Sequence, residues 1–291
     1  MNLDTPRDSG AAAASPSGFV PIRETISLRG ALTDTLVITK RNLLRNVRLP
    51  QLLLFATIQP VMFLLLFNYV FGGAIGQTLP PGVDSYTNFL LPGLLVQIAT
   101  FGASQTALGL TEDLSKGVID RFRALPMSRA AVLAGRTLAD LLRNAAVLSL
   151  MLTVGFLIGF RYQTSLWGFL GGFAIALLFA YALSWAMATI GLYVQNPEAA
   201  QSAAFLPIFP FVFASSVFLP TETMPDWLRV FADNQPVTIV ANAIRGLMLG
   251  QAAMPAGQTV AGEVLAALAW LGGITAVFSV LAVRAYRRAV N

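Results

Sequence analysis

Long apolar runs without charge alternate with short polar connections along most of the chain. A helix needs about 20 residues to cross the ~30 Å hydrocarbon core of a bilayer, so runs of this length predict membrane-spanning helices. Five runs contain no Asp, Glu, Lys or Arg, at residues 52–71, 85–111, 162–197, 199–221 and 264–283. A sixth run, 145–160, is shorter and must extend toward Thr137, which takes in Asp140 and Arg143 near the membrane edge. The pattern predicts an all-α polytopic membrane protein with six transmembrane helices, in a domain covering residues 49–291.

The connections between these runs differ in character. The sequence QNPEAA at 195–200 contains the helix breaker Asn-Pro and predicts a tight hairpin between spans four and five. Residues 72–84 are rich in Gly and Pro and predict a loop. The segment 220–262 is long and mixed, and it includes the helix-like stretch VTIVANAIRGLMLG at 237–250.

Two segments precede the first span. Residues 1–24 include DSGAAAASPSG and have no apolar core of the kind that signal peptides need, so a disordered cytoplasmic tail is expected. In residues 25–48, helical spacing gathers Leu28, Leu32, Leu36, Leu43 and Val47 on one face and Asp34, Arg41, Arg45 and Arg48 on the other. This arrangement favours a helix in the membrane interface, and the alternative is an ordinary cytoplasmic extension of the first span.

Basic residues are distributed unequally between the two sides of the predicted spans. The chain has 19 Lys and Arg against 14 Asp and Glu, a net charge of +5, while 56% of its residues are hydrophobic. A basic balance can indicate nucleic acid, but here the cations flank apolar runs, so no nucleic-acid partner is expected. With the N-terminus inside, fifteen Lys and Arg face the cytoplasm and three, Arg161, Arg229 and Arg245, face outward; Arg143, inside the third span, is the nineteenth and is not assigned to a side. The sequence therefore predicts a multi-pass protein of the plasma (inner) membrane with both termini cytoplasmic.

The chain contains no Cys and no His, which removes disulfides, thiol nucleophiles and typical zinc sites. It also lacks the H-E-x-x-H and G-x-S-x-G motifs and a pair of intramembrane aspartates, which argues against the alternative of a membrane-embedded enzyme. No metal or cofactor is expected to bind this chain.

The polar side chains within the spans are neutral. Gln59, Asn68, Gln97, Gln105 and Ser215 are candidates for the wall of a transport pathway, or alternatively for hydrogen bonds between helices. Proton coupling needs a titratable group inside the membrane, and the central parts of the spans carry none, which argues against a channel or secondary transporter. Neither Lys40 nor Lys116 lies in a phosphate-binding G-x-x-x-x-G-K-[ST] loop, so the energy is expected from a separate ATPase chain.

The connection between spans two and three carries a patterned cluster of charges. In a helix over 112–124 with Thr111 as N-cap, Leu114, Val118 and Phe122 share one face, and Pro126 ends the helix. A second helix is expected after Ser128, running into span three. Positive-inside topology explains part of the charge, but an amphipathic helix of both signs favours a docking element. Its candidate residues are Asp113, Lys116, Asp120, Arg121, Phe122, Arg123, Leu125 and Pro126.

Three stretches in this order carry a family resemblance: EDLSKGVIDRFRALPMSRAAVLAGRTLADLLR at 112–143, NPEAAQ at 196–201, and 215–250 with its P.WL, NQP.T and A.RGL..G spacing. They resemble the membrane subunits of ABC-2-type ATP-binding-cassette exporters, particularly daunorubicin-resistance-like permeases. The resemblance implies two permease copies or homologues per complex and a separate pair of ABC ATPase subunits that bind ATP and Mg.

The same resemblance assigns roles to the segments. It implies that the helix around 113–125 is a coupling helix that enters a groove on the ATPase, and that 28–48 is the interfacial connecting helix. It also implies that 220–250 forms short external helices partly re-entering the membrane. The expected cargo is a hydrophobic drug, antibiotic or lipid, and export of a polysaccharide is the alternative, because related permeases move both classes.

Overall fold

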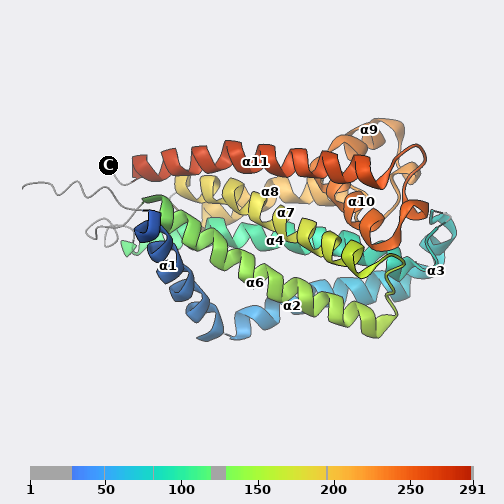
Figure 1. Cartoon of the computed structure of the whole chain (residues 1–291), viewed down its shortest axis with the longest axis horizontal. Helices are drawn as coiled ribbons and strands as arrows, with labels where there is room; N and C mark the ends of the chain where they lie inside the picture. Colours follow the sequence, from blue (N-terminus) through green and yellow to red (C-terminus); the bar gives the residue numbers. More distant parts are fainter. Residues whose placement is uncertain (1–27, 49, 81, 119–128, 195, 290–291) are drawn as a thin grey trace, which may run out of the picture.

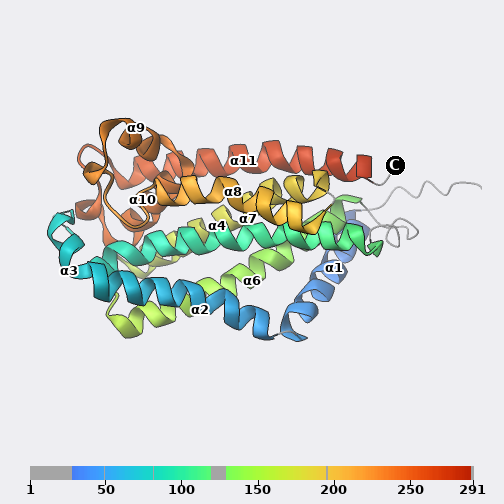
Figure 2. The ribbon, with the colours of Figure 1, turned by 180° about the vertical axis from the view of Figure 1, so that it is seen from behind.

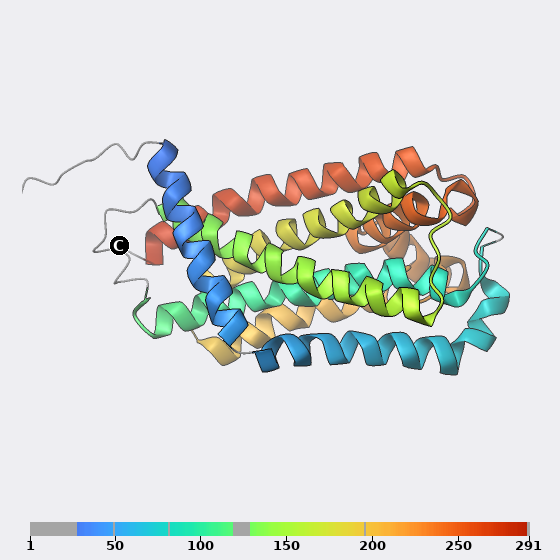
Figure 3. The same ribbon diagram turned by 60° about the horizontal axis from the view of Figure 1, so that its bottom comes forward.

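The computed structural model describes residues 28–48, 50–80, 82–118, 129–194 and 196–289. Every regular element in these ranges is a helix. Figure 1 shows long helices running side by side along the longest axis. The end of α11 and one end of α1 lie at one end of this bundle, and α3, α9 and α10 lie at the other (Figure 1). Figure 3 shows that α1 crosses the bundle obliquely.

The helices have the following bounds: α1 Leu28–Arg48, α2 Pro50–Leu66, a π-helical turn Phe67–Phe71, α3 Gly72–Ile75, α4 Tyr86–Ser115, α6 Arg129–Ile158, α7 Leu166–Tyr193, α8 Pro197–Phe213, α9 Asp226–Asn234, α10 Pro236–Leu249 and α11 Val260–Ala289. Single turns of 3₁₀-helix lie at 76–78, 221–223 and 251–253.

Helix α4 forms the centre of the bundle. It packs against α2, α6, α7, α8 and α10, and seen from behind it lies between α2 and α8 (Figure 2). In its most apolar part 78% of the residues are buried, against 11% for α11, and Leu90, Leu91, Leu94 and Leu95 are fully buried. The remaining long helices therefore expose most of their apolar surface to the surroundings of the bundle, as expected for helices in lipid.

Among the described residues, five helices are long and apolar enough to cross a membrane: Thr57–Ile75, Tyr86–Ser115, Val132–Ile158, Leu166–Tyr193 and Val260–Tyr286. The predicted span 199–221 is not among them. Helix α8 ends at Phe213 after 17 residues, a length of about 25 Å at 1.5 Å per residue. The predicted span ran on to Thr221 because residues 214–221 contain no charge. In the structure the backbone turns after Phe213. The side-chain amide of Gln235 donates to the carbonyls of Phe211 and Ala214 at 2.7 and 3.0 Å.

The expected hairpin after α7 is confirmed. The Asn196 side-chain oxygen accepts the backbone N–H groups of Glu198 and Ala199 at 2.9 and 3.3 Å, and Pro197 occupies the first turn of α8. Both features are typical helix starts, because they satisfy or remove N–H groups that have no partner within the helix. The expected helix in 237–250 is also confirmed as α10, which ends at Gly250 with φ of +92°.

Helix α1 covers residues 28–48 of the predicted interfacial segment, whereas residues 1–27 lie outside the described ranges. It packs on α6 through Ile38 and Thr39, and the Thr39 hydroxyl donates to the Gly135 carbonyl at 3.2 Å. The predicted apolar stripe faces elsewhere, because Leu32 and Leu36 are 64% and 62% exposed. The face that contacts the bundle is thus the one containing Ile38, while the leucines remain available to lipid.

Candidate functional site

Helix α4 continues beyond the membrane run and ends four residues later than the predicted boundary. Thr111 was expected to cap a new helix, which is wrong, because it lies inside α4 and its hydroxyl donates to the Ala107 and Gly191 carbonyls at 2.9 and 3.0 Å. The helix ends at Ser115, and Gly117 follows with φ of +63°, a conformation that favours glycine. Asp113 therefore belongs to the end of α4.

The rest of the predicted docking element is only partly described. Lys116 lies just after α4 and pairs with Glu112 at 3.3 Å on the surface. Asp120, Arg121, Phe122, Arg123, Leu125 and Pro126 lie outside the described residues. The second expected helix is confirmed, because α6 starts at Arg129 and continues into the membrane run.

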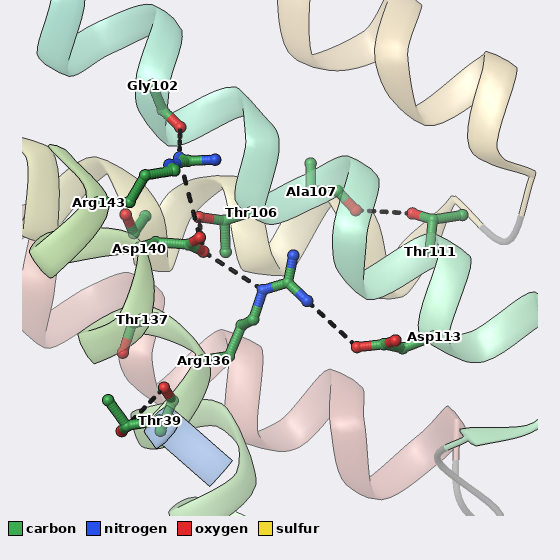
Figure 4. A network of polar contacts seen from close by, with 12 residues as sticks. Thr39, Gly102, Thr106, Ala107, Thr111, Asp113, Arg136, Thr137, Asp140 and Arg143 are labelled. Atoms are coloured by element: carbon green, nitrogen blue, oxygen red, sulfur yellow. Dashed lines mark hydrogen bonds and ion pairs between the residues drawn. The ribbon is translucent and has the colours of Figure 1, made fainter. Parts of the chain in front are cut away.

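Three charged side chains meet at the base of this connection (Figure 4). Arg136 of α6 lies between two carboxylates, with Nη1 3.2 Å from Oδ2 of Asp113 and Nε 3.4 Å from Oδ2 of Asp140. The side chains of Arg136 and Asp140 are 5% and 4% exposed, and that of Asp113 is 12% exposed. A buried charge is tolerated only when it is paired and hydrogen-bonded, and one guanidinium here serves two carboxylates at once.

Further groups complete what we call the ion network, which comprises Arg41, Asp113, Arg136, Asp140 and Arg143. Arg41 of α1 lies 3.8 Å from Asp113, and Arg143 lies 3.8 Å from Asp140. Three cations face two carboxylates, and the network joins α1, α4 and α6 where the 116–128 connection begins and ends.

Neutral groups hold the inner part of the ion network in place. Thr106 of α4 donates its hydroxyl proton to Asp140 at 2.7 Å, and Arg143 donates to the Gly102 carbonyl at 2.7 Å (Figure 4). Asp140 thus receives contacts from both α4 and α6. A displacement of the start of α6 would be transmitted to α4 through these contacts.

Gly109 of α4 makes room for this arrangement. A Cβ atom at Gly109 would overlap the guanidinium of Arg136, so glycine at this position leaves room for the guanidinium against α4. The sequence analysis did not identify Gly109 or Asp140 as site residues. The signals available were the charge spacings of Arg136, Asp140 and Arg143, four and three residues apart, which are typical of pairs on one helix face.

We expect Gly109→Ala to lower the midpoint of thermal unfolding of the purified chain. The added methyl must push Arg136 away from its carboxylates, and overpacking of this kind costs about 1–3 kcal/mol. The control is Gly272→Ala in α11, where a Cβ would meet no atom within 4 Å and where alanine favours the helix. An equal or higher midpoint for Gly109→Ala than for the control would contradict the packing argument.

The candidate pathway residues do not converge on one place. Gln59 of α2 and Gln105 of α4 are exposed, whereas Gln97 of α4 is 4% exposed and its Oε1 has no partner among the described residues. Asn68 accepts a hydrogen bond from Thr87 of α4 at 2.6 Å, and therefore contributes a bond between helices.

Ser215 differs from the other pathway candidates. It is 1% exposed and donates to the Val212 carbonyl at 2.5 Å, within the turn that follows α8. Its hydroxyl is thus occupied by the local backbone.

A second buried cation lies at the opposite end of the bundle. Arg245 of α10 was counted as an outward-facing loop charge, but it is 2% exposed. Nε donates to the Phe89 carbonyl at 3.0 Å, and Nη1 donates to the Ser216 hydroxyl and the Asn242 side chain, both at 3.0 Å. Nη2 donates to the carbonyls of Ser216 and Val217.

The Arg245 guanidinium also lies over the ring of Phe89, with its central carbon 3.8 Å from the ring centroid. Among the described residues, every oxygen that accepts from it is uncharged. The group therefore joins the start of α4, the turn after α8 and α10, three segments far apart in the sequence. Burial could not be predicted, because it depends on carbonyl groups that these other segments supply.

The all-helical bundle of the described residues, with its long apolar helices, is that of a multi-pass membrane protein. A sequence profile of the ABC-2 type transporter family matches residues 33–249, and the chain belongs to this family. It is thus a permease subunit of an ABC transporter, a class that carries no catalytic ATPase domain and associates with an ATPase subunit.

Curated relatives cover nearly the whole chain. The daunorubicin resistance ABC transporter permease protein DrrB1 of Streptomyces coeruleorubidus is 34% identical over 271 residues, covering 93% of this chain and 90% of the relative. The probable doxorubicin resistance permease protein DrrC of Mycobacterium tuberculosis is 27% identical over 259 residues, covering 89% and 90%. A putative transport permease, ycf38, of Cyanophora paradoxa is 23% identical over 225 residues, covering 74% of each.

Proposed function

We propose that this permease exports a hydrophobic drug, antibiotic or lipid, driven by a separate pair of ATPase subunits that bind ATP and Mg. The observation that carries the coupling mechanism is the buried ion network at the base of the 116–128 connection. The names of the relatives, which refer to daunorubicin and doxorubicin resistance, support a hydrophobic drug as cargo.

The proposed topology has six spans with both termini in the cytoplasm. Helix α8 is the fifth of these spans, and the turn 214–220 completes its passage at the end where α9 and α10 lie. Figure 1 supports a common side for the basic segments, because the end of α4, the start of α6 and the end of α11 lie at one end of the bundle. The excess of Lys and Arg in these segments favours the cytoplasm for this end.

In the proposed mechanism, closure of the ATPase pair moves the docked connection as a rigid body. The connection leaves α4 after Asp113 and enters α6 before Arg136, so its movement acts first on the pair formed by these two residues. Arg136 and Asp140 then carry the displacement into the membrane parts of α6 and α4. The interface with a second permease copy opens at the other end as a result.

We expect the double change Arg121→Glu, Arg123→Glu to reduce both co-purification of the ATPase subunit and ATP-dependent transport. Reversal of two charges in the predicted docking element should weaken its electrostatic fit to the ATPase while leaving the apolar spans unchanged. Transport is measured as ATP-dependent uptake of doxorubicin into inverted membrane vesicles, followed by its fluorescence.

The matched control is Arg287→Glu, Arg288→Glu, which makes the same charge change near the C-terminus. Membrane insertion should be normal in both double variants, and ATPase association should fall only in the first. Wild-type association and uptake in the Arg121→Glu, Arg123→Glu variant would refute the proposed coupling role.

A further inference from the structure

A row of phenylalanine rings joins α2 to the end of α8, at the end of the bundle where α3 and α10 lie. We propose that these rings close each permease copy toward the outside, and that α2 parts from Phe218 when cargo is released. The rings, called here the phenylalanine seam, are those of Phe63, Phe67, Phe213 and Phe218. The inference rests on the proposed export function, and it concerns a closure within one copy rather than the interface between two copies.

The rings of the phenylalanine seam stack on one another in a continuous row. Phe63 lies in α2, Phe67 begins the π-helical turn that continues it, and Phe213 is the last residue of α8. The centroid of the Phe218 ring lies 4.7 Å from that of Phe67 and 5.3 Å from that of Phe213. The Phe63 centroid lies 5.8 Å from that of Phe67 and 6.2 Å from that of Phe218. These separations are those of attractive aromatic pairs, and Phe218 is the ring that connects the two helices.

The phenylalanine seam is the principal link between α2 and α8. Both helices pack on α4, and in the part of the chain that the structure describes they have no comparable packing on each other. Figure 2 shows α4 lying between them. Stacked rings make no hydrogen bond, so they can part without leaving a polar group unsatisfied inside the membrane. The link between α2 and α8 is thus one that can open and close again.

The exposure of α4 changes along its length, as expected for a passage closed at this end. Every residue of 86–100 is buried, whereas Phe101 is partly exposed and Gln105 is exposed. Leu94 lies seven residues after Thr87, which bonds to the π-helical turn, and seven before Phe101, which contacts rings of α8. It therefore lies on the side of α4 that faces α2 and α8. This side is fully covered at the level of the seam, and it becomes exposed toward the 116–128 connection.

The turn that carries Phe218 is held by other helices than α2. Tyr86 of α4 donates its hydroxyl proton to the Phe218 carbonyl at 2.9 Å, and Arg245 of α10 donates to the Val217 carbonyl at 3.3 Å. The Phe218 side chain is 5% exposed. These contacts fix Phe218 to α4, α8 and α10, so the seam is expected to part on its other side, between Phe67 and Phe218.

Helix α2 has the features of the element that moves. In the most apolar part of α2 and the turn that continues it, 11% of the residues are buried. Pro60 and the π-helical turn 67–71 interrupt the regular backbone hydrogen bonds, and such interruptions let helices bend. Helix α1, which precedes α2, carries Arg41 of the ion network, 3.8 Å from Asp113. A movement of the 116–128 connection therefore has a route to α2 that leaves the turn with Phe218 in place.

A cross-link across the phenylalanine seam tests whether it must open. The chain has no Cys, so Phe67→Cys, Phe218→Cys introduces a single pair, and a short, uncharged bis-methanethiosulfonate joins it in the transporter assembled with a cysteine-free ATPase subunit. We expect the cross-link to abolish ATP-dependent doxorubicin uptake into inverted vesicles and dithiothreitol to restore it.

The matched control is Phe156→Cys, Phe169→Cys, which joins α6 to α7 where the ring centroids lie 5.7 Å apart. Its cross-link should leave uptake unchanged, because the short connection 159–165 already ties these two helices together. Undiminished uptake with the cross-linked seam, or an equal loss of uptake in both cross-linked variants, would overturn the proposal.

A second readout requires no cargo. The yield of the cross-link between positions 67 and 218 is compared in the nucleotide-free complex and in the complex trapped with ATP and vanadate. We expect the yield to fall on trapping, and the yield of the control pair to stay the same. Equal yields in the two states, or no cross-link in the nucleotide-free complex, would overturn the gate. A fall in yield without doxorubicin uptake by the wild type would count against the proposed cargo and would still support the gate.

Discussion

Replacement of Arg136 by Met is expected to destabilise the purified chain by about 3–5 kcal/mol and to abolish ATP-driven transport, because it removes the cation from between two buried carboxylates. Asp113 and Asp140 would then lie in a nearly dry environment, with Arg41 and Arg143 more distant at 3.8 Å each. The measurement is the midpoint of thermal unfolding in detergent, together with ATP-dependent uptake in inverted vesicles.

A surface pair at the end of α4 provides the control. Lys116 lies 3.3 Å from Glu112, nearly the distance between Arg136 and Asp113, but its side chain is 66% exposed. Lys116→Met should change stability by only about 0–1 kcal/mol, since water already solvates both partners. Equal midpoints for Arg136→Met and Lys116→Met would show that burial does not determine the strength of the network.

Neutralising the carboxylates separates stability from coupling. In the triple variant Arg136→Met, Asp113→Asn, Asp140→Asn no buried carboxylate remains without its cation, although Arg41 and Arg143 lose these acidic partners, so the midpoint should return partway toward that of the wild type. If the ion network transmits movement from the ATPase, transport should remain low. Recovery of both midpoint and transport would mean that the network only stabilises the fold.

Helix boundaries could be predicted where a local sequence signal determines them. The Asn196-Pro197 start of α8 and the Gly250 end of α10 each depend on residues within one turn of the boundary. The end of α4 was misplaced because Thr111, Glu112 and Asp113 are good helix-start residues, although the chain there is already helical. Gly117 was a local signal for the observed end of α4, since glycine commonly follows the last turn of a helix.

The contacts within the ion network could not be predicted from the sequence, because they join residues of different helices. Asp113 and Arg136 are 23 residues apart, and Gly109 leaves the space against α4 that the Arg136 guanidinium occupies. Composition indicated correctly that positive charge gathers at this connection. It could not show that Arg136 is buried, because burial follows from the crossing of α1, α4 and α6 rather than from the local pattern.

Replacement of Arg245 should have the second large effect, at the other end of the molecule. In Arg245→Leu the carbonyls of Phe89, Ser216 and Val217 lose a donor, and each buried group left unsatisfied costs about 1–3 kcal/mol. Arg245→Lys keeps the charge but has only three donors on one atom, so it cannot reach all the oxygens that surround the planar guanidinium. Both variants should unfold at a lower temperature than the wild type.

The absence of cysteine allows the local consequence to be measured. The Val217 side chain is fully buried in the turn that Arg245 holds, so a Val217→Cys reporter should resist a water-soluble maleimide. Adding Arg245→Leu should make the reporter reactive, because the turn loses the contacts that fix it to α4 and α10. Arg229→Leu, which removes an exposed ion pair from neighbouring α9, should leave the reporter protected.

The two buried cations, Arg136 and Arg245, lie at opposite ends of the bundle, so we expect their replacement to affect different parts of the protein. Arg245→Leu should retain co-purification of the ATPase subunit, since the altered turn lies at the opposite end of the bundle from the end of α4 and the start of α6. Transport should nevertheless fall, because the turn, α4 and α10 no longer move together. Arg136→Met should leave the Val217→Cys reporter protected. Loss of ATPase association in Arg245→Leu, or a still unreactive reporter in that variant, would contradict this separation of the two ends.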